Sequence, residues 1–182
     1  MFTMTTKYIL TGGPGSGKST IRLKLESWGE YTIPEAAEDC IKLRQAEGID
    51  EPWKEADFQE RILRTQIQRE SQIPSHIKRA FPDRGIPDGL VYVPDGSAIY
   101  NKIAGSIPDD YATEVFLIET MSWIDRNKVR RENLDQSLRI AEQLEEEYTR
   151  RGHRVYRIGM GTPDERTIKL RNIVHEVEGG RK

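Results

Sequence analysis

The sequence predicts an α/β protein in which a mostly parallel sheet is covered by helices on both faces. Three observations lead to this prediction. Short apolar segments alternate with longer amphipathic segments along the chain, a glycine-rich loop follows the first apolar segment, and 182 residues suffice for one domain with its own core. We expect one domain over residues 1–182. With 36% hydrophobic and 32% charged residues, the composition suits a soluble protein with a charged surface.

Five short segments are expected to form the strands of this sheet. The clearest is 115–118, where four apolar residues follow one another. The others are 7–11, 31–33, 79–82 and 154–158. Segment 79–82 is the least regular, because Pro82 cannot donate a hydrogen bond to a neighbouring strand.

Helices are expected between the strands. Apolar residues at helical spacing mark 19–28, 35–46 and 134–148, and a proline begins a last helix over 163–177. Gly152 is expected to end the helix that precedes the last strand. Residues 51–78 are highly charged with sparse apolar positions, which predicts one long amphipathic helix, interrupted near Pro74.

Composition argues against several classes of protein. A formal net charge of −2 does not favour a general nucleic-acid binder. The single cysteine, Cys40, excludes an internal disulfide, and the three histidines have no metal-ligand spacing, so no zinc or iron site is expected. The sequence has no apolar stretch long enough to span a membrane and no secretory signal at its start. We therefore expect a cytoplasmic protein.

The segment 12–19 reads Gly-Gly-Pro-Gly-Ser-Gly-Lys-Ser and matches a phosphate-binding loop in full. Glycines let backbone N–H groups approach phosphate oxygens, Lys18 reaches the terminal phosphates and Ser19 offers its hydroxyl to Mg2+. A chance glycine-rich turn is the alternative, but the strand before it and the helix after it favour phosphate binding. The residues expected to bind ATP, or another nucleoside triphosphate, are Gly13, Gly15, Ser16, Gly17, Lys18, Ser19 and Thr20.

Four segments together resemble a known family. GGPGSGKST (12–20), IPEAAE (33–38), PDRGIPDGLVY (82–92) and WIDRNKVRRE (123–132) are similar to P-loop ATPases and kinases that include the ribosylnicotinamide kinase-type domain of NAD-metabolism proteins. Thymidylate and deoxynucleoside kinases are more distant relatives. The resemblance implies a three-layer α/β/α P-loop NTPase fold with a five-stranded sheet of order 2-3-1-4-5. It also implies a site at the carboxyl ends of the strands and a lid-like segment at about 122–133.

The resemblance assigns roles to four residues outside the loop. Asp83 would bind Mg2+ together with Ser19, and Arg84 would bind the substrate or a phosphate, although Pro-Asp-Arg-Gly is also an ordinary turn. Asp88 matches a second family acid that binds substrate, or it only caps a helix. Glu35 would contact the acceptor hydroxyl and act as base, or it is only a first-turn acid.

The arginine segment after the fourth strand has two interpretations. Arginines that close over the site would stabilise the charge of a transferring phosphoryl group, and the resemblance makes Arg130 a catalytic residue and Arg126 a substrate contact. The alternative is a solvated basic loop before a helix. Trp53, Trp123 and Tyr92 either stack on a base or sugar or serve in packing.

Three functions follow from these observations. The first is ATP- and Mg2+-dependent phosphoryl transfer to a small hydroxylated metabolite, such as a nucleoside-like one. The second is a nucleotide-dependent switch or binding module with slow hydrolysis, although Asn127-Lys128 is followed by Val129-Arg130 and so lacks the acid that reads guanine. The third is a ring-forming AAA ATPase, although 182 residues are few for the extra helical domain that such proteins carry. The expected partners are the nucleotide and a small-molecule acceptor, without nucleic acid or membrane, in a monomer or homodimer.

Overall fold

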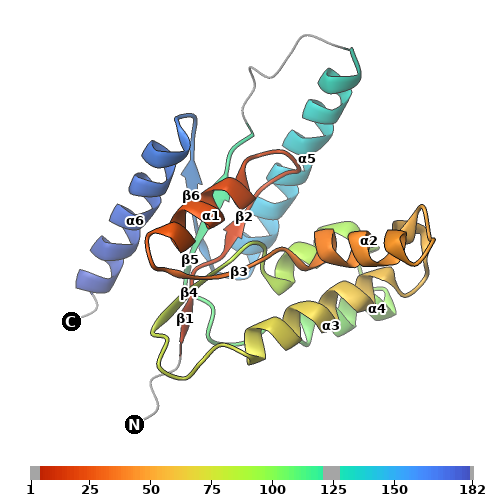
Figure 1. The fold of residues 1–182 in the computed structure, drawn as a ribbon, viewed down its shortest axis with the longest axis horizontal. Helices are drawn as coiled ribbons and strands as arrows, with labels where there is room; N and C mark the ends of the chain where they lie inside the picture. The colour runs from red at the N-terminus through yellow and green to blue at the C-terminus, as the bar shows by residue number, and fades with distance from the viewer. Residues whose placement is uncertain (1–4, 121–127, 181–182) are drawn as a thin grey trace.

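The computed structural model describes residues 5–120 and 128–180, with the backbone alone for 128–133 (Figure 1). Strands and helices alternate along this part of the chain. In order they are β1 (Thr6–Lys7), β2 (Leu10–Thr11), α1 (Lys18–Ser27), β3 (Tyr31–Ile33), α2 (Ala36–Ala46), η1 (Pro52–Lys54), α3 (Phe58–Ser71), β4 (Arg79–Pro82), η2 (Ile86–Tyr92), α4 (Ala98–Ala104), β5 (Glu114–Ile118), α5 (Lys128–Arg150), β6 (Arg154–Ile158) and α6 (Pro163–Gly180).

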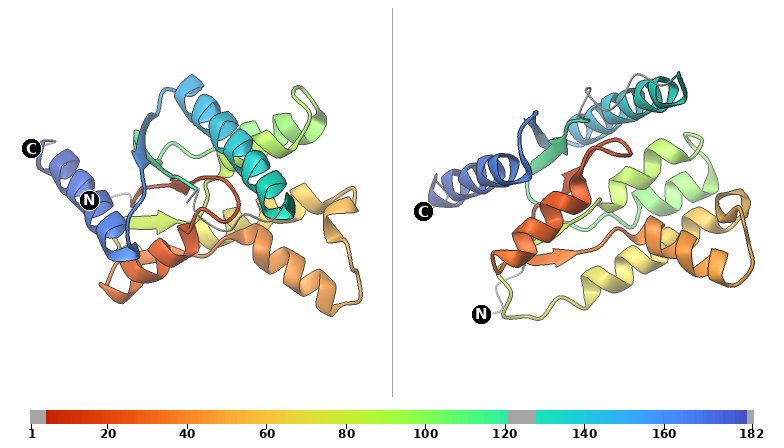
Figure 2. Two further views of the ribbon diagram at one scale, coloured as in Figure 1. Left: turned by 90° about the horizontal axis from the view of Figure 1, so that it is seen from above. Right: turned by 45° about the horizontal axis from the view of Figure 1, so that its top comes forward.

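The strands form parallel sheets with helices on both faces, as expected (Figure 2). Successive residues of a strand point to opposite faces, and the first strand segment shows this alternation. Tyr8 and Leu10 pack with residues of α1 and α6, including Ile21 and Leu170. Ile9 packs on the other face with residues of α3, η2, α4 and α5. Because both faces are covered, the central segment Tyr8, Ile9 and Leu10 is fully buried.

The prediction of a single five-stranded sheet in the order 2-3-1-4-5 was wrong. The expected first strand is divided into β1 and β2, and each belongs to its own three-stranded sheet, in the orders β1-β4-β3 and β2-β5-β6. Pro82 gives a physical reason. The Tyr8 N–H donates to the Ala80 carbonyl at 2.9 Å and the Arg84 N–H donates to the Leu10 carbonyl at 2.8 Å. Pro82 lies between these two bonds and has no N–H to continue the ladder.

The other predicted segments agree with the structure except one. Segments 31–33, 79–82 and 154–158 are strands with these bounds, and Gly152 has the left-handed φ of 86° expected after the end of a helix. The prediction of a single long helix over 51–78 was wrong, because a short 3₁₀ helix, η1, and the helix α3 occupy this segment. Between them the backbone at Glu55 is extended, and its carboxylate accepts a hydrogen bond from Arg44 Nε of α2 at 2.9 Å. No helix of the described part is long and apolar enough to cross a membrane.

Candidate active site

The glycine-rich loop joins β2 to α1, at the carboxyl ends of the parallel strands. Its backbone has positive φ at Gly12 (142°), Gly15 (72°) and Gly17 (90°), a region that favours glycine. At Gly12 space is also limiting, since a Cβ atom there would lie 2.4 Å from the Ile118 carbonyl oxygen. The sequence therefore needs glycine to make this turn and bring the chain onto the N-terminus of α1.

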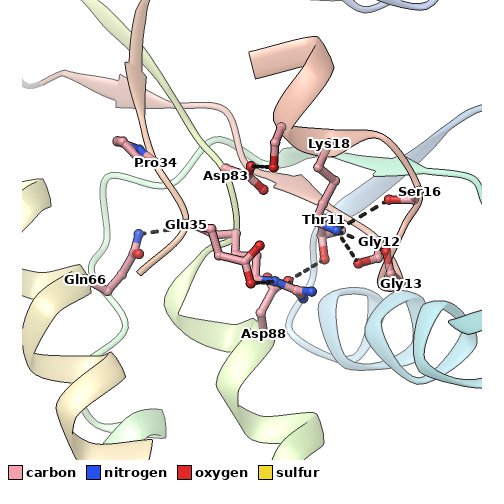
Figure 3. A network of polar contacts seen from close by, with 12 residues as sticks. Thr11, Gly12, Gly13, Ser16, Lys18, Pro34, Glu35, Gln66, Asp83 and Asp88 are labelled. Carbon is pink, nitrogen blue, oxygen red and sulfur yellow. Dashed lines mark hydrogen bonds and ion pairs between the residues drawn. The ribbon is translucent and has the colours of Figure 1, made fainter. Parts of the chain in front are cut away.

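Lys18 folds back over the loop (Figure 3). Its Nζ donates to the carbonyl oxygens of Gly12 and Gly13, each at 3.0 Å, and to Ser16 Oγ at 3.4 Å. Lys18 forms no ion pair with a carboxylate in the described ranges. Burial lowers the pKa of Lys18 to about 8, the charge of Arg84 adds to this effect, and the nearby carboxylates of the site offset it only in part. The ammonium group therefore has neutral partners only, next to the loop.

Asp83 and Ser19 lie beside the loop as a close pair. Asp83 follows β4, and its N–H donates to the Ile33 carbonyl at 2.8 Å, which fixes it at the strand end. The Ser19 hydroxyl donates to Asp83 Oδ2 at 2.8 Å, while the buried Oδ1 has no hydrogen-bond partner. Burial raises the pKa of Asp83. A hydroxyl and an incompletely bonded carboxylate are oxygen ligands of the kind that Mg2+ binds in nucleotide sites.

Arg84 is the only residue other than glycine with positive φ in the described part of the chain, at 75°. Its Nε donates to Glu35 Oε1 at 2.8 Å and its Nη1 to Asp88 Oδ1 at 3.2 Å. Burial lowers the pKa of Arg84, but the nearby charges of Asp88 and Glu35 outweigh burial and raise it. A non-glycine residue in this conformation is strained unless its surroundings hold it, and such strain is common at functional sites.

Asp88 accepts more hydrogen bonds than any other carboxylate of the site. Its donors are the Thr11 hydroxyl at 2.7 Å, the Tyr148 hydroxyl at 2.6 Å, the Gly85 N–H at 3.1 Å and Arg84. The bond from Gly85 caps η2, so the expectation of a helix cap is confirmed. Its role as a substrate contact stays a prediction.

Three cavities adjoin one another at this edge of the sheet. The cradle cavity, about 480 Å³, lies along the loop and is lined by Pro14, Gly15, Gly17, Lys18, Ser19, Thr20, Glu35, Ala37, Glu38, Ile41 and Arg84. The side cavity, about 340 Å³, lies between α2, η1, α3 and η2. The rear cavity, about 550 Å³, lies between the start of α1 and the start of α6.

Shared lining residues connect the three cavities. Glu35 and Arg84 line both the cradle cavity and the side cavity, and Gly17 and Thr20 line both the cradle cavity and the rear cavity. The lining of the side cavity is largely apolar and includes the aromatic side chains of Trp53, Phe58 and Tyr92. The loop therefore lies between two spaces that each have room for an organic group.

Most of the predicted site residues lie together. Figure 3 shows Lys18, Glu35, Asp83 and Asp88 converging from separate elements, and Ser19 and Arg84 are bonded to members of this group. The predicted lid segment is not tested. Arg126 and Trp123 lie outside the described residues, and Arg130 falls in the first turn of α5, whose side chains are not described. No group of three or more His, Cys, Asp or Glu that could bind a metal occurs within the described ranges.

Some residues of the site had no signal in the sequence. Thr11 and Tyr148 hold Asp88, and Gln66 Nε2 of α3 donates to the Arg84 carbonyl at 3.2 Å. Arg166 of α6 donates to the Ser16 carbonyl at 2.9 Å, from 150 positions away in sequence. These contacts depend on the tertiary fold, and no local motif marks them.

Comparison with known proteins places the chain in a family. A family model described as an AAA domain matches residues 7–166. The chain belongs to this AAA domain family. The expected resemblance to P-loop ATPases and kinases is thereby confirmed. No curated protein matches the sequence.

Solved structures show the same fold at low sequence identity. The NadR protein in complex with NR superposes with a TM-score of 0.71 at 18% identity, over 94% of this chain and 51% of that one. The chain thus spans about half of NadR. Thymidylate kinase from Ehrlichia chaffeensis gives 0.63 at 16%, over 93% and 98%, and deoxyadenosine kinase from M. mycoides gives 0.60 at 14%, over 94% and 100%. At these identities the comparison shows a P-loop kinase-like α/β fold.

Proposed function

We propose that this protein transfers a phosphoryl group from ATP, or a related nucleoside triphosphate, to a hydroxyl group of a small metabolite. The observation that carries the proposal is the pair of connected cavities on either side of Glu35 and Arg84. A phosphoryl transferase needs its donor phosphate and its acceptor in contact. A chain that only binds or hydrolyses a nucleotide has no need of the side cavity.

The loop would bind the triphosphate. Its backbone N–H groups and Lys18 would contact the phosphates, and the N-terminus of α1 adds the favourable end of a helix dipole. The rear cavity, which shares Gly17 and Thr20 with the cradle cavity, would take the nucleoside of the donor. Ser19 and Asp83 would bind Mg2+, since Asp83 Oδ1 is buried and lacks a partner. When bound, Mg2+ would neutralise phosphate charge.

The side cavity would bind the acceptor. Its aromatic lining, from Trp53, Phe58 and Tyr92, suits a molecule with a flat or apolar ring, and Glu35 lies where the cavity meets the cradle. Glu35 would accept the proton of the attacking hydroxyl, and Arg84 would stabilise charge on the transferring group. A nucleoside-like alcohol has both the ring and the hydroxyl. The names of the structural neighbours, two of which are nucleoside or nucleotide kinases, support the same class.

An assay of ADP release with and without acceptors tests this proposal. The purified protein is incubated with ATP and MgCl2 alone, and then with a panel of nucleosides and cyclic polyols. We expect at least one nucleoside-like acceptor to raise turnover far above slow hydrolysis. If none does, the kinase proposal fails, and acceptor-independent hydrolysis would favour the nucleotide-dependent switch.

Glu35→Gln sharpens this assay. General-base catalysis contributes about 100-fold or more, so we expect acceptor-dependent turnover to fall by about that factor while ATP binding is kept. Glu47→Gln, at the far end of α2, is the matched control and should behave like the wild type. A Glu35→Gln variant that keeps its full acceptor-dependent rate would remove Glu35 from the mechanism. Cytoplasmic location and a monomeric or homodimeric state remain predictions.

A further inference from the structure

Arg166 is a buried cation behind the phosphate-binding loop. It lies in the first turn of α6 and is only 3% exposed. Its Nη1 donates to the Ser16 carbonyl at 2.9 Å, and its Nη2 donates to the carbonyls of Glu119 at 2.7 Å and Ile158 at 3.2 Å. Its Nε is buried without a hydrogen-bond partner. The guanidinium group thus joins the loop to the chain just after β5 and to the end of β6.

No carboxylate in the described part of the chain is bonded to Arg166. Its hydrogen-bond partners are all backbone carbonyls, and it forms no ion pair within the described residues. The side chain of Glu119 is instead bonded to Arg157, at 3.2 Å. The first turn of a helix is also the wrong end for a cation, because the helix dipole is positive there. Burial lowers the pKa of Arg166, and the nearby charge of Glu119 offsets this effect only in part.

Arg166 lies directly behind the phosphate-binding loop, so a polyphosphate bound in the loop would be a partner for its charge. A Cβ atom on Gly17 would lie 3.3 Å from Arg166 Nη1, so glycine allows the guanidinium group its close approach. The Ser16 carbonyl is bonded to Arg166, and the peptide bonds of the described chain are all trans. The Gly17 N–H of the same peptide unit therefore points away from Arg166. Gly17 itself lines the cradle cavity.

We propose that Arg166 is an electrostatic and positioning residue of the phosphate site, and that the polyphosphate of the nucleotide supplies a counter-charge to its buried guanidinium group, which is bonded to no carboxylate of the described residues. The inference rests on the proposed function, because it requires a polyphosphate in the cradle. It adds a second buried cation, behind the loop, to the Lys18 in front of it. A buried charge interacts strongly with another charge because little water screens it.

Arg171 provides a matched control on the same helix. Its guanidinium group lies over the ring of Trp28, and its Nε is 3.5 Å from Glu30 Oε1. The buried Nε of Arg171 also has no hydrogen-bond partner, but unlike Arg166 it forms an ion pair, so its counter-charge lies within the protein. Comparing Arg166→Gln with Arg171→Gln distinguishes the loss of a charge next to the phosphate-binding loop from the loss of any arginine in α6.

Calorimetry with AMP, ADP and ATP in MgCl2 tests the inference. An electrostatic role predicts a loss of affinity that grows with the charge of the ligand. We expect Arg166→Gln to weaken ATP binding by about tenfold, ADP by less and AMP least, and the difference from the wild type to shrink at high salt. Arg166→Lys keeps the charge and should bind ATP within about threefold of the wild type. Arg171→Gln should match the wild type.

Each contrary outcome has a separate meaning. If the wild type binds ATP and Arg166→Gln binds it equally well, or loses AMP, ADP and ATP equally, Arg166 only ties the loop in place and the inference is overturned. A tenfold loss of ATP affinity in Arg166→Lys also overturns the inference, because the hydrogen bonds of Arg166 and not its charge would then matter. The Arg166→Lys variant therefore tests the inference even if Arg166→Gln does not fold. If the wild type itself binds no ATP, the proposed function has failed instead.

Discussion

Two buried lysines lie near opposite ends of the first strand segment, and their surroundings differ. Lys7 and Lys18 are each 5% exposed. Lys7 Nζ forms ion pairs with Glu70 at 2.9 Å and Asp110 at 2.8 Å. Lys18 Nζ has only carbonyl and hydroxyl oxygens as partners. The charge of Lys7, at the amino end of the sheet, is therefore balanced by ion pairs within the protein, and that of Lys18, at the carboxyl end, is not.

Two buried aspartates of the site show the same contrast at close range. Asp88 accepts hydrogen bonds on both carboxylate oxygens, from four donors. Asp83, which is 1% exposed, accepts one bond from Ser19, and its Oδ1 has none. Burying a polar group without a partner costs free energy, so proteins seldom keep such groups where nothing binds. Of these two aspartates, the one with an unpartnered oxygen is therefore the one that we expect to bind a ligand, and the fully bonded one is expected to hold the fold.

The largest expected difference is between Lys18→Met and Lys7→Met. Lys18→Met should weaken ATP binding by about 100-fold or more, because the ammonium group would contact the terminal phosphates. The folded protein should be no less stable, since a poorly compensated buried charge is removed. Lys7→Met should instead lower the free energy of unfolding by about 3 kcal/mol or more, because Glu70 is left buried with its charge unpaired.

Urea unfolding and calorimetry with ATP measure both effects. The ATP affinity of folded Lys7→Met should equal that of the wild type, which makes each variant the control for the other. Loss of stability in Lys18→Met, with unchanged ATP affinity, would show that incomplete pairing does not mark the binding site.

A smaller difference is expected between Asp83→Asn and Asp88→Asn. Asp83→Asn should lower Mg2+-dependent turnover by about tenfold to 100-fold while leaving ATP binding without Mg2+ unchanged. Because burial raises the pKa of Asp83, its charged form is disfavoured in the folded state. The neutral amide should therefore leave the nucleotide-free protein as stable as the wild type or more stable.

Asp88→Asn should act mainly on stability. The amide would face donors from Tyr148 and Gly85 and would leave Arg84 short of a charge, so we expect a loss of about 2–4 kcal/mol in urea unfolding. If Asp83→Asn reduced ATP binding and turnover equally, with or without Mg2+, Asp83 would be a structural residue and the contrast between the two aspartates would not hold.

The sequence predicted those parts of the site that depend on local chain geometry. The loop at 12–19 could be found because its glycines, Lys18 and Ser19 lie within one short segment and have fixed roles. Glu35, Asp83 and Arg84 could be named from family segments, but the bond between Glu35 and Arg84 joins residues 49 positions apart and depends on where β3 and β4 end. The pattern of apolar segments predicted the order of strands and helices for the same local reason.

Other features could not be predicted, because they depend on long-range contacts. The division of the first strand follows from the hydrogen bond that Pro82 cannot make to its neighbour, which requires knowing the register of β1 against β4. Arg166 lies in an ordinary helical sequence, and only the fold brings it against Ser16. The incomplete pairing of Asp83 and Arg166 is likewise a property of packing, which a linear motif does not record.

Within about one pH unit of 8, the smallest expected effect is a dependence of ATP affinity on pH through Lys18. Its pKa in the nucleotide-free protein is about 8, against 10.5 when unperturbed, and a bound polyphosphate would raise it again. Binding should therefore take up a proton above that pKa, and ATP affinity should fall by up to about tenfold per pH unit as the pH rises past about 8. The same shift means that the unfolded chain holds the Lys18 proton more tightly, so this group makes the nucleotide-free protein more stable as pH rises from about 8 to 10.5.

Calorimetry above pH 8 in two buffers of different ionisation enthalpy measures this proton uptake directly. The wild type should show a binding enthalpy that depends on the buffer, and Lys18→Met should show none of this dependence. Equal ATP affinity of the wild type on both sides of pH 8, with no buffer dependence, would mean that Lys18 already has its full charge before the nucleotide binds. The two lysines would then differ in their neighbours but not in the free-energy cost of burying their charge. Burial of a cation with neutral partners would no longer identify the ligand-binding end of the sheet.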